Sequence, residues 1–163
     1  TRKESSAASD VYKRQTRRGG EGMADEGGYR NPSLAVDAVS VREGPRGLQV
    51  LLITRGFPPY EGRLAFPGGF VERGEDPETA VLRELSEETG IEGSNPELFA
   101  VRGDPNRDPR KHIVSIFYRV RVDPDAIPEA GDDARDAEWI ELEGLVAEQL
   151  AGDHYSIIEK LRK

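Results

Sequence analysis

Three glutamates, Glu84, Glu87 and Glu88, constrain what this chain can fold into more than any other residues. Their spacings of three and four place the carboxylates on one face of a helix. They fall in the last two predicted turns, where the helix dipole is negative and costs an acid roughly 0.3–1 kcal/mol. Each like-charged pair adds on the order of 0.2–0.5 kcal/mol, which Arg83 offsets only in part. Two interpretations follow: a solvated acidic face, or a site for a hard divalent cation such as Mg²⁺.

The helix that carries these glutamates has clear end signals. Asp76 is a good N-cap, Pro77 suits the first helical position, and Gly90 is typical of the residue that ends a helix. At 100° per residue the apolar side chains gather on one side. This predicted core face consists of Val81, Leu82, Leu85 and Thr89.

The rest of the patterned region predicts strands with helices between and after them. Alternating apolar residues are typical of half-buried strands, and the predicted strands are 34–41 (with an irregularity in its middle), 48–54, 64–66, 70–71, 97–101, 114–122 and 137–142. Two closing helices are predicted over 143–150 and 155–161. This order indicates an α/β domain with a mixed sheet covered on both faces.

Composition narrows the class of protein. The longest apolar runs, 50–53 and 98–101, are four residues each, far below the ~20 needed to span a bilayer. There is no cysteine, so disulfides and thiolate metal sites are excluded. The whole chain has a net charge of −8 and residues 1–22 carry +3, so the remainder carries −11. A protein body with this charge should repel nucleic acid, and it would need cations at its site to hold an anionic substrate. We expect a soluble, cytoplasmic protein with no membrane or nucleic-acid partner.

The N-terminal segment differs from the rest. Residues 1–30 lack periodicity and are rich in Ser, Gly, Arg and Glu, which predicts a disordered tail. Met23, the only methionine, stands just before the patterned region, so we interpret the residues before it as not native. A basic arm that binds a partner is the alternative. The functional domain is therefore expected at 31–163.

A glycine turn precedes the helix. Gly68 and Gly69 follow Pro67, and glycines let the backbone approach a ligand or metal closely; an ordinary turn is the alternative. Glu75 stands just before the helix, where it can pair with Arg83 and brace the turn against it.

These residues together resemble a known motif. Gly69, five residues, Glu75, seven residues, and then the run Arg83 to Ile91 match the complete Nudix box of the Nudix hydrolase family. Looser similarity to ADP-ribose pyrophosphatase-like members extends from about 33 to 161. It includes segments 57–62, 103–105, 107–110, 131–134, 137–139 and 153–154.

The resemblance implies an α/β/α sandwich and a metal-dependent active site with Mg²⁺ or Mn²⁺. By position, Glu84, Glu87 and Glu88 would hold the metal with the carbonyl of Gly68, while Glu75 and Arg83 would form a structural ion pair. The family's general base is either a glutamate of the box or an acid from a later loop. The loop candidates here are Asp132 and Asp133, and a solvated acidic turn is their alternative.

Other candidates rest on residue chemistry alone. Arginines in the predicted loops can bind phosphate by charge-assisted hydrogen bonds, although solvated loops are the alternative; they are Arg55, Arg63, Arg107 and Arg110. Phe57 or Tyr60 is a candidate for stacking on a base, with packing as the alternative. Trp139 is expected in the core, and His154 is expected to be a helix cap or a surface residue.

The resemblance implies metal-dependent hydrolysis of the diphosphate of a nucleoside diphosphate derivative, and the looser similarity points to ADP-ribose, which would give AMP and ribose 5-phosphate. Two alternatives stay open: a pyrophosphohydrolase for an oxidised nucleoside triphosphate, and a nucleotide-sensing Nudix module without catalysis. The predicted partner is the small-molecule substrate, and a homodimer is kept open.

Overall fold

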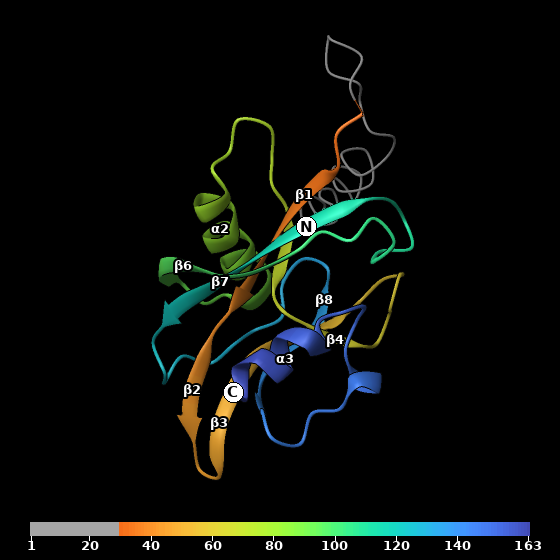
Figure 1. The fold of residues 1–163 in the computed structure, drawn as a ribbon. Helices are drawn as coiled ribbons and strands as arrows, with labels where there is room; N and C mark the ends of the chain where they lie inside the picture. Colours follow the sequence, from red (N-terminus) through yellow and green to blue (C-terminus); the bar gives the residue numbers. More distant parts are fainter. Residues whose placement is uncertain (1–29) are drawn as a thin grey trace, which may run out of the picture.

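The computed structural model describes residues 30–163 (Figure 1). The interpretation of the segment before Met23 as not native lies outside these residues and stays a prediction. The strands are β1 (Ser33–Val39), β2 (Val41–Gly44), β3 (Gly47–Arg55), β4 (Leu64–Ala65), β5 (Gly68–Phe70), β6 (Gly93–Arg102), β7 (Ile113–Val122) and β8 (Ala134–Glu141). The helices are α2 (Pro77–Thr89), the 3₁₀ helix η1 (Ala147–Gln149) and α3 (Tyr155–Leu161).

The strands form two sheets, and the prediction of a mixed sheet is confirmed. One sheet has the order β5-β1-β7-β6, in which β1 is parallel to β7 and antiparallel to β5. The other is built around β3, which pairs antiparallel with β2, β4 and β8. The irregularity expected within 34–41 is the passage from one sheet to the other at Ser40. The Ser40 hydroxyl donates to the carbonyl of Val120 (3.0 Å), and its carbonyl accepts from the amide of Leu51 (3.0 Å).

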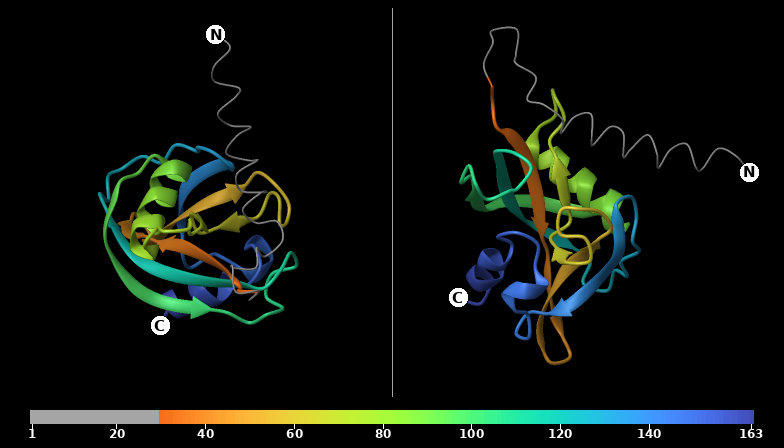
Figure 2. Two further views of the ribbon diagram at one scale, coloured as in Figure 1. Left: turned by 90° about the horizontal axis from the view of Figure 1, so that it is seen from above. Right: turned by 90° about the vertical axis from the view of Figure 1, so that its right-hand side faces the viewer.

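Helices cover the strands from opposite sides, as the left view of Figure 2 shows for α2 and α3. Val81 and Leu85 of α2 pack with strand residues in one core cluster. Ile157 and Ile158 of α3 pack in a second cluster that contains Phe117. Phe117 is completely buried, because β7 is a central strand with a helix on each side.

The ends of α2 are as predicted. The Asp76 side chain accepts from the amide of Glu78 at 2.9 Å, and Gly90 adopts the left-handed conformation with φ 69°. Of the predicted core face, Val81, Leu85 and Thr89 are buried and Leu82 is partly buried. The caps therefore fix where α2 begins and ends, and so on which turns its glutamates lie.

The helix predicted over 143–150 was wrong, because the chain there makes only the single turn η1. The physical reason is a tertiary contact. The Arg162 guanidinium donates to the carbonyls of Leu142 (2.6 Å), Glu143 (2.9 Å) and Leu145 (2.8 Å), groups that α-helical amides four residues later would otherwise take. Leu142, Leu145 and Leu150 reach the core without a regular helix. No helix within residues 30–163 is long and apolar enough to cross a membrane.

Candidate active site

A cavity of about 420 Å³ opens where the two sheets separate. Strands β1, β3 and β5, helix α2 and the loops before β7, β8 and α3 all contribute to its wall. Its polar lining from these distant segments includes Asp37, Arg55, Glu88, Arg110, Asp133 and His154. Its volume is within the range of sites for small molecules.

Two of the three helix glutamates are inside the protein. Glu84 and Glu88 are only 4% and 6% exposed, whereas the side chain of Glu87 is 41% exposed. A solvated acidic face therefore does not describe Glu84 or Glu88. Only Glu88 of the three lines the cavity.

The glycine turn packs directly on these carboxylates. The amide of Gly68 donates to Oε2 of Glu88 at 3.0 Å. A Cβ on Gly68 would collide with the carbonyl of Val36, and one on Gly69 would collide with the carboxylate of Glu84. Backbone therefore excludes a side chain at Gly68, whereas a side chain at Gly69 would require the Glu84 carboxylate to move.

Arg83 ties the loop to the helix. It makes two hydrogen bonds to Glu75, from Nε to Oε1 (2.7 Å) and from Nη2 to Oε2 (3.0 Å). Its Nη1 donates to Glu84 (2.8 Å) and Glu87 (3.2 Å), and its Nη2 reaches the carbonyl of Phe70 (3.3 Å). The hydrogen bonds that Arg83 donates to Glu75 are the main reason that the pKa of Arg83 is raised. The guanidinium is thus held by the loop and by two of the glutamates.

The positive charge near Glu84 and Glu88 does not offset the cost of burying their carboxylates. Burial raises the pKa of Glu84 to about 7, although Arg83 acts in the opposite direction. Burial, and next the charge of Glu84, raise the pKa of Glu88 well above its usual value. A cation placed beside two buried carboxyl groups with raised pKa values would favour their charged forms.

The three predicted carboxylate ligands are two buried side chains, Glu84 and Glu88, and one exposed side chain, Glu87. Within residues 30–163, no three His, Cys, Asp or Glu side chains converge as a ready-made metal site. The Glu87 side chain is exposed, and its carboxylate forms an ion pair with Arg83. Magnesium usually takes one or two carboxylates and completes its shell with waters and substrate phosphates, so the buried oxygens of Glu84 and Glu88 fit such an ion.

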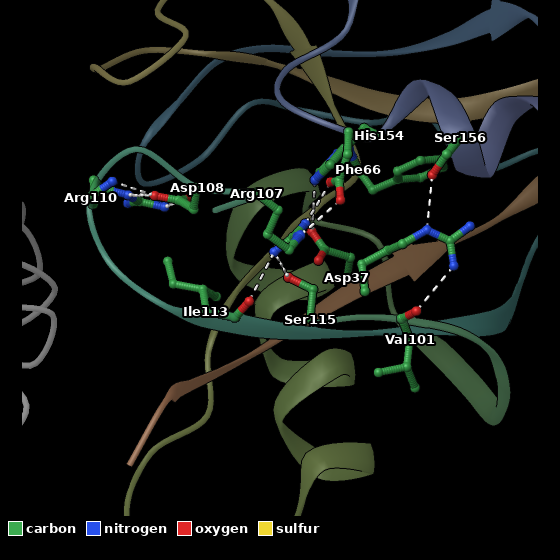
Figure 3. Close-up of polar contacts among 12 residues, drawn as sticks. Asp37, Phe66, Val101, Arg107, Asp108, Arg110, Ile113, Ser115, His154 and Ser156 are labelled. Atoms are coloured by element: carbon green, nitrogen blue, oxygen red, sulfur yellow. Dashed lines mark hydrogen bonds and ion pairs between the residues drawn. The ribbon is translucent and has the colours of Figure 1, made fainter. Parts of the chain in front are cut away.

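The four candidate arginines separate into different roles. Arg63 lies outside the cavity, with Nη1 3.4 Å from the carbonyl of Leu150. Arg107 lines the cavity, but its side chain is 8% exposed and bonded to Asp153 (2.6 and 2.8 Å) and Ser115 (3.0 Å). Figure 3 shows this arginine between the strand and the segment before α3. Arg107 therefore already has acceptors in the protein.

Arg55 and Arg110 are the better placed cations. Arg110 also pairs with an acid, Asp108, through Nε (3.0 Å) and Nη2 (2.9 Å), but its side chain is 43% exposed whereas that of Arg107 is 8% exposed (Figure 3). Arg55 uses Nε to bond the carbonyl of Pro59 at 2.7 Å. Burial and then the positive charge of Arg110 lower the pKa of Arg55. Two guanidinium groups that repel each other in one cavity would be stabilised by a bound anion.

The two loop acids also differ. Asp133 lines the cavity, whereas Asp132 is exposed, has a positive φ of 49° and does not line it. The loop docks on the end of α2 because the amide of Gly131 donates to the carbonyl of Glu88 at 3.1 Å. Asp133 raises the pKa of Glu88 by its charge. The structure therefore brings Asp133, and not Asp132, to the cavity.

The sequence interpretation missed two buried residues of the cavity wall. Asp37 of β1 is 7% exposed, and burial raises its pKa to about 7. His154 was expected to be a helix cap or a surface residue; it does stand at the start of a helix, but it is not a surface residue. It occupies the N-cap position of α3 without a capping bond, and its side chain is 14% exposed between Phe66 and Phe117. The sequence signal for Asp37 was a single acidic residue inside the predicted strand 34–41. No feature of the sequence near His154 predicted that it would be buried.

Comparison with known proteins gives concordant matches. The NUDIX domain model matches residues 31–161. The "ADP-ribose pyrophosphatase" of Methanocaldococcus jannaschii is 42% identical over 131 residues, which are 80% of this chain and 73% of that protein. The "8-oxo-dGTP diphosphatase" of Escherichia coli is 36% identical over 62% of this chain and 75% of that protein. The crystal structure of the NUDIX domain of Shewanella oneidensis NrtR complexed with ADP ribose superposes with a TM-score of 0.76 at 30% identity, covering 85% of this chain and 91% of that one.

Proposed function

This chain belongs to the Nudix family, and we propose that it hydrolyses the diphosphate of ADP-ribose to give AMP and ribose 5-phosphate. One observation carries the proposal: a single cavity has the buried Glu88 on one wall and the cations Arg55 and Arg110 among its lining residues. Carboxylate oxygens suit a divalent cation and guanidinium groups suit phosphate, and a diphosphate bound to a metal ion needs both.

Glu84 and Glu88 are the proposed carboxylate ligands of Mg²⁺ or Mn²⁺, with the carbonyl of Gly68 as a further candidate. Their burial and raised pKa values support this assignment. When bound, the ion would lower the pKa of water and neutralise charge on the phosphates.

The chain's own residues supply the remaining steps. Arg55 and Arg110 bind the phosphate oxygens and orient the diphosphate. Asp133 accepts the proton of the attacking water, which its place in the cavity lining favours over the exposed Asp132. Phe57 and Tyr60 line the same cavity and are the candidates for contact with the adenine ring.

A substrate panel with product identification tests the proposal. With Mg²⁺ present, we expect ADP-ribose to give AMP and ribose 5-phosphate in equal amounts. We expect Arg55→Ala to raise KM by roughly tenfold or more, since a charge-assisted hydrogen bond contributes about 1.5–3 kcal/mol. Arg121→Ala, which changes an exposed arginine of β7 away from the cavity, is the matched control.

The panel also separates the other candidates. Cleavage of 8-oxo-dGTP with no cleavage of ADP-ribose would favour the triphosphate alternative, which the Escherichia coli relative supports. Saturable binding of ADP-ribose without turnover at any Mg²⁺ or Mn²⁺ concentration would favour the sensing module, which the NrtR domain supports. The cytoplasmic location, the homodimer and the lack of a nucleic-acid partner stay predictions from the sequence.

A further inference from the structure

The chain passes from one sheet to the other between β4 and β5, and one backbone group is held at each of three successive residues, the last of which is the first residue of β5. The carbonyl of Pro67 accepts from the amide of Ala38 at 2.7 Å. The amide of Gly68 donates to Glu88, as described above. The amide of Phe66 donates to Nδ1 of His154 at 3.2 Å. Phe66 is buried and follows the last paired residue of β4, so a side chain supplies the acceptor that the sheet does not.

His154 is suited to be that acceptor. Its ring lies between the rings of Phe66 and Phe117, with centroids 5.5 and 5.4 Å away. Burial lowers its pKa to about 4, so the ring is neutral near pH 7 and one nitrogen carries a lone pair. Because Nδ1 accepts from Phe66, the proton must lie on Nε2, which is 3.9 Å from Oδ1 of Asp37.

The backbone around His154 is itself anchored. Its amide donates to the carbonyl of Ala151 (3.1 Å), and the amide of Ala151 donates to the carbonyl of Leu64 in β4 (2.8 Å). The preceding residue, Asp153, holds Arg107 through both carboxylate oxygens. Figure 3 shows His154 and Phe66 side by side next to this ion pair. The imidazole of His154 is therefore held in place by two aromatic rings, by its hydrogen bond with Phe66 and by its backbone.

We propose that His154 is a positioning residue: its Nδ1 fixes the amide of Phe66 and thereby the turn that sets Gly68 against Glu88. This role rests on the proposed function, since it matters for catalysis only if Glu88 is part of the site. His154 need not touch the substrate. Without the acceptor, the buried amide of Phe66 is left unsatisfied, and the turn must shift to find another partner. A shift of about 1 Å at a catalytic group can reduce turnover by roughly 100-fold.

Two isosteric variants distinguish this role from a direct one. His154→Asn places an amide oxygen near the position of Nδ1, whereas His154→Gln places its polar group near Nε2. We expect His154→Asn to keep kcat within a few-fold of wild type and His154→Gln to lose roughly 100-fold in kcat with a smaller change in KM. The opposite order would overturn the proposal, because it would assign the function to Nε2 and Asp37. His112→Asn changes the other histidine, which does not line the cavity, and is the matched control.

A second readout uses the metal-free full chain and needs no activity. Nitrogen NMR of the wild-type imidazole should show a neutral ring with the proton on Nε2; a proton on Nδ1 would overturn the proposal even if a variant failed to fold. Hydrogen exchange of the Phe66 and Gly68 amides should be slow in wild type and His154→Asn, and at least tenfold faster in His154→Gln. Equal protection in all three proteins would also overturn it. Because these measurements omit substrate, their failure is distinct from failure of the hydrolase assignment.

Discussion

Replacing Glu88 by glutamine should have opposite effects on activity and on stability. The side chain is 6% exposed, accepts from the amide of Gly68 and lies in the field of Glu84, Asp133 and Asp37. Glutamine keeps the shape and one acceptor oxygen but removes the charge. If the charge holds a metal ion, losing several kcal/mol of transition-state stabilisation lowers kcat by about 10³-fold.

The stability of the metal-free protein should change in the other direction. The pKa of Glu88 is raised on folding, so the unfolded chain ionises first as the pH rises above 4.5, and stability is lost as the pH rises through the folded pKa. Glu88→Gln lacks this loss. Its free energy of unfolding should exceed that of wild type at pH 8 by about 1–3 kcal/mol, the usual cost of an unsatisfied buried group, with little difference near pH 4.

Urea unfolding of metal-free protein at pH 4 and pH 8, together with turnover of ADP-ribose at saturating Mg²⁺, measures both effects. Glu97→Gln, an exposed glutamate of β6, is the control and should change neither quantity. Near wild-type turnover in Glu88→Gln at saturating metal would refute the proposed role of this carboxylate. A loss of stability at pH 8 would refute the reasoning from burial.

Three further outcomes are expected. Gly69→Ala forces a methyl group against the Glu84 carboxylate, so we expect a loss of about 1–3 kcal/mol in unfolding free energy and a large fall in kcat, measured by denaturation and steady-state kinetics. Arg83→Lys cannot reproduce the two parallel hydrogen bonds to Glu75 and should cost about 1–3 kcal/mol in thermal or urea unfolding, whereas an unchanged midpoint would contradict the bracing role. The pKa of Glu84 rises from 4.5 to about 7 on folding. Between pH 4 and pH 8, the free energy of unfolding of metal-free wild type should therefore fall by up to about 3 kcal/mol relative to that of Glu84→Gln. Parallel curves of unfolding free energy against pH for the two proteins would contradict this. The pKa shifts of Asp37 and His154 also make the unfolding free energy depend on pH, in the same direction as Glu84 for Asp37 and in the opposite direction for His154. Because both proteins contain these residues, comparing them at each pH removes these contributions.

Local chemistry made α2 predictable. An N-cap side chain, a proline at the first position and a glycine at the end act over a few residues, so their effects do not depend on the rest of the fold. The spacing of the glutamates also follows from the helix alone. The region 143–150 was not predictable in this way, because the contact that replaces helical hydrogen bonds comes from Arg162 near the end of the chain.

The cavity wall depended on distant parts of the chain. Asp37 and His154 are 117 positions apart in the sequence, and they meet only because the segment before α3 lies against the crossing between the sheets. A polar residue buried by such contacts looks the same in sequence as one on the surface. The same limit applies to the arginines, since no local signal distinguished Arg63, which is outside the cavity, from Arg55, which lines it.

The three glutamates that looked equivalent in the sequence are not equivalent in the structure. Glu84 and Glu87 both contact Arg83, so part of their charge is already balanced. The Glu88 carboxylate instead accepts a hydrogen bond from the amide of Gly68, which supplies a dipole and not a full charge. Glu88 is also the one of the three that lines the cavity. The like-charge cost estimated for a solvated helix is therefore largest at the side chain that faces the cavity, and we expect the charge of Glu88 to be the one that a bound cation stabilises most.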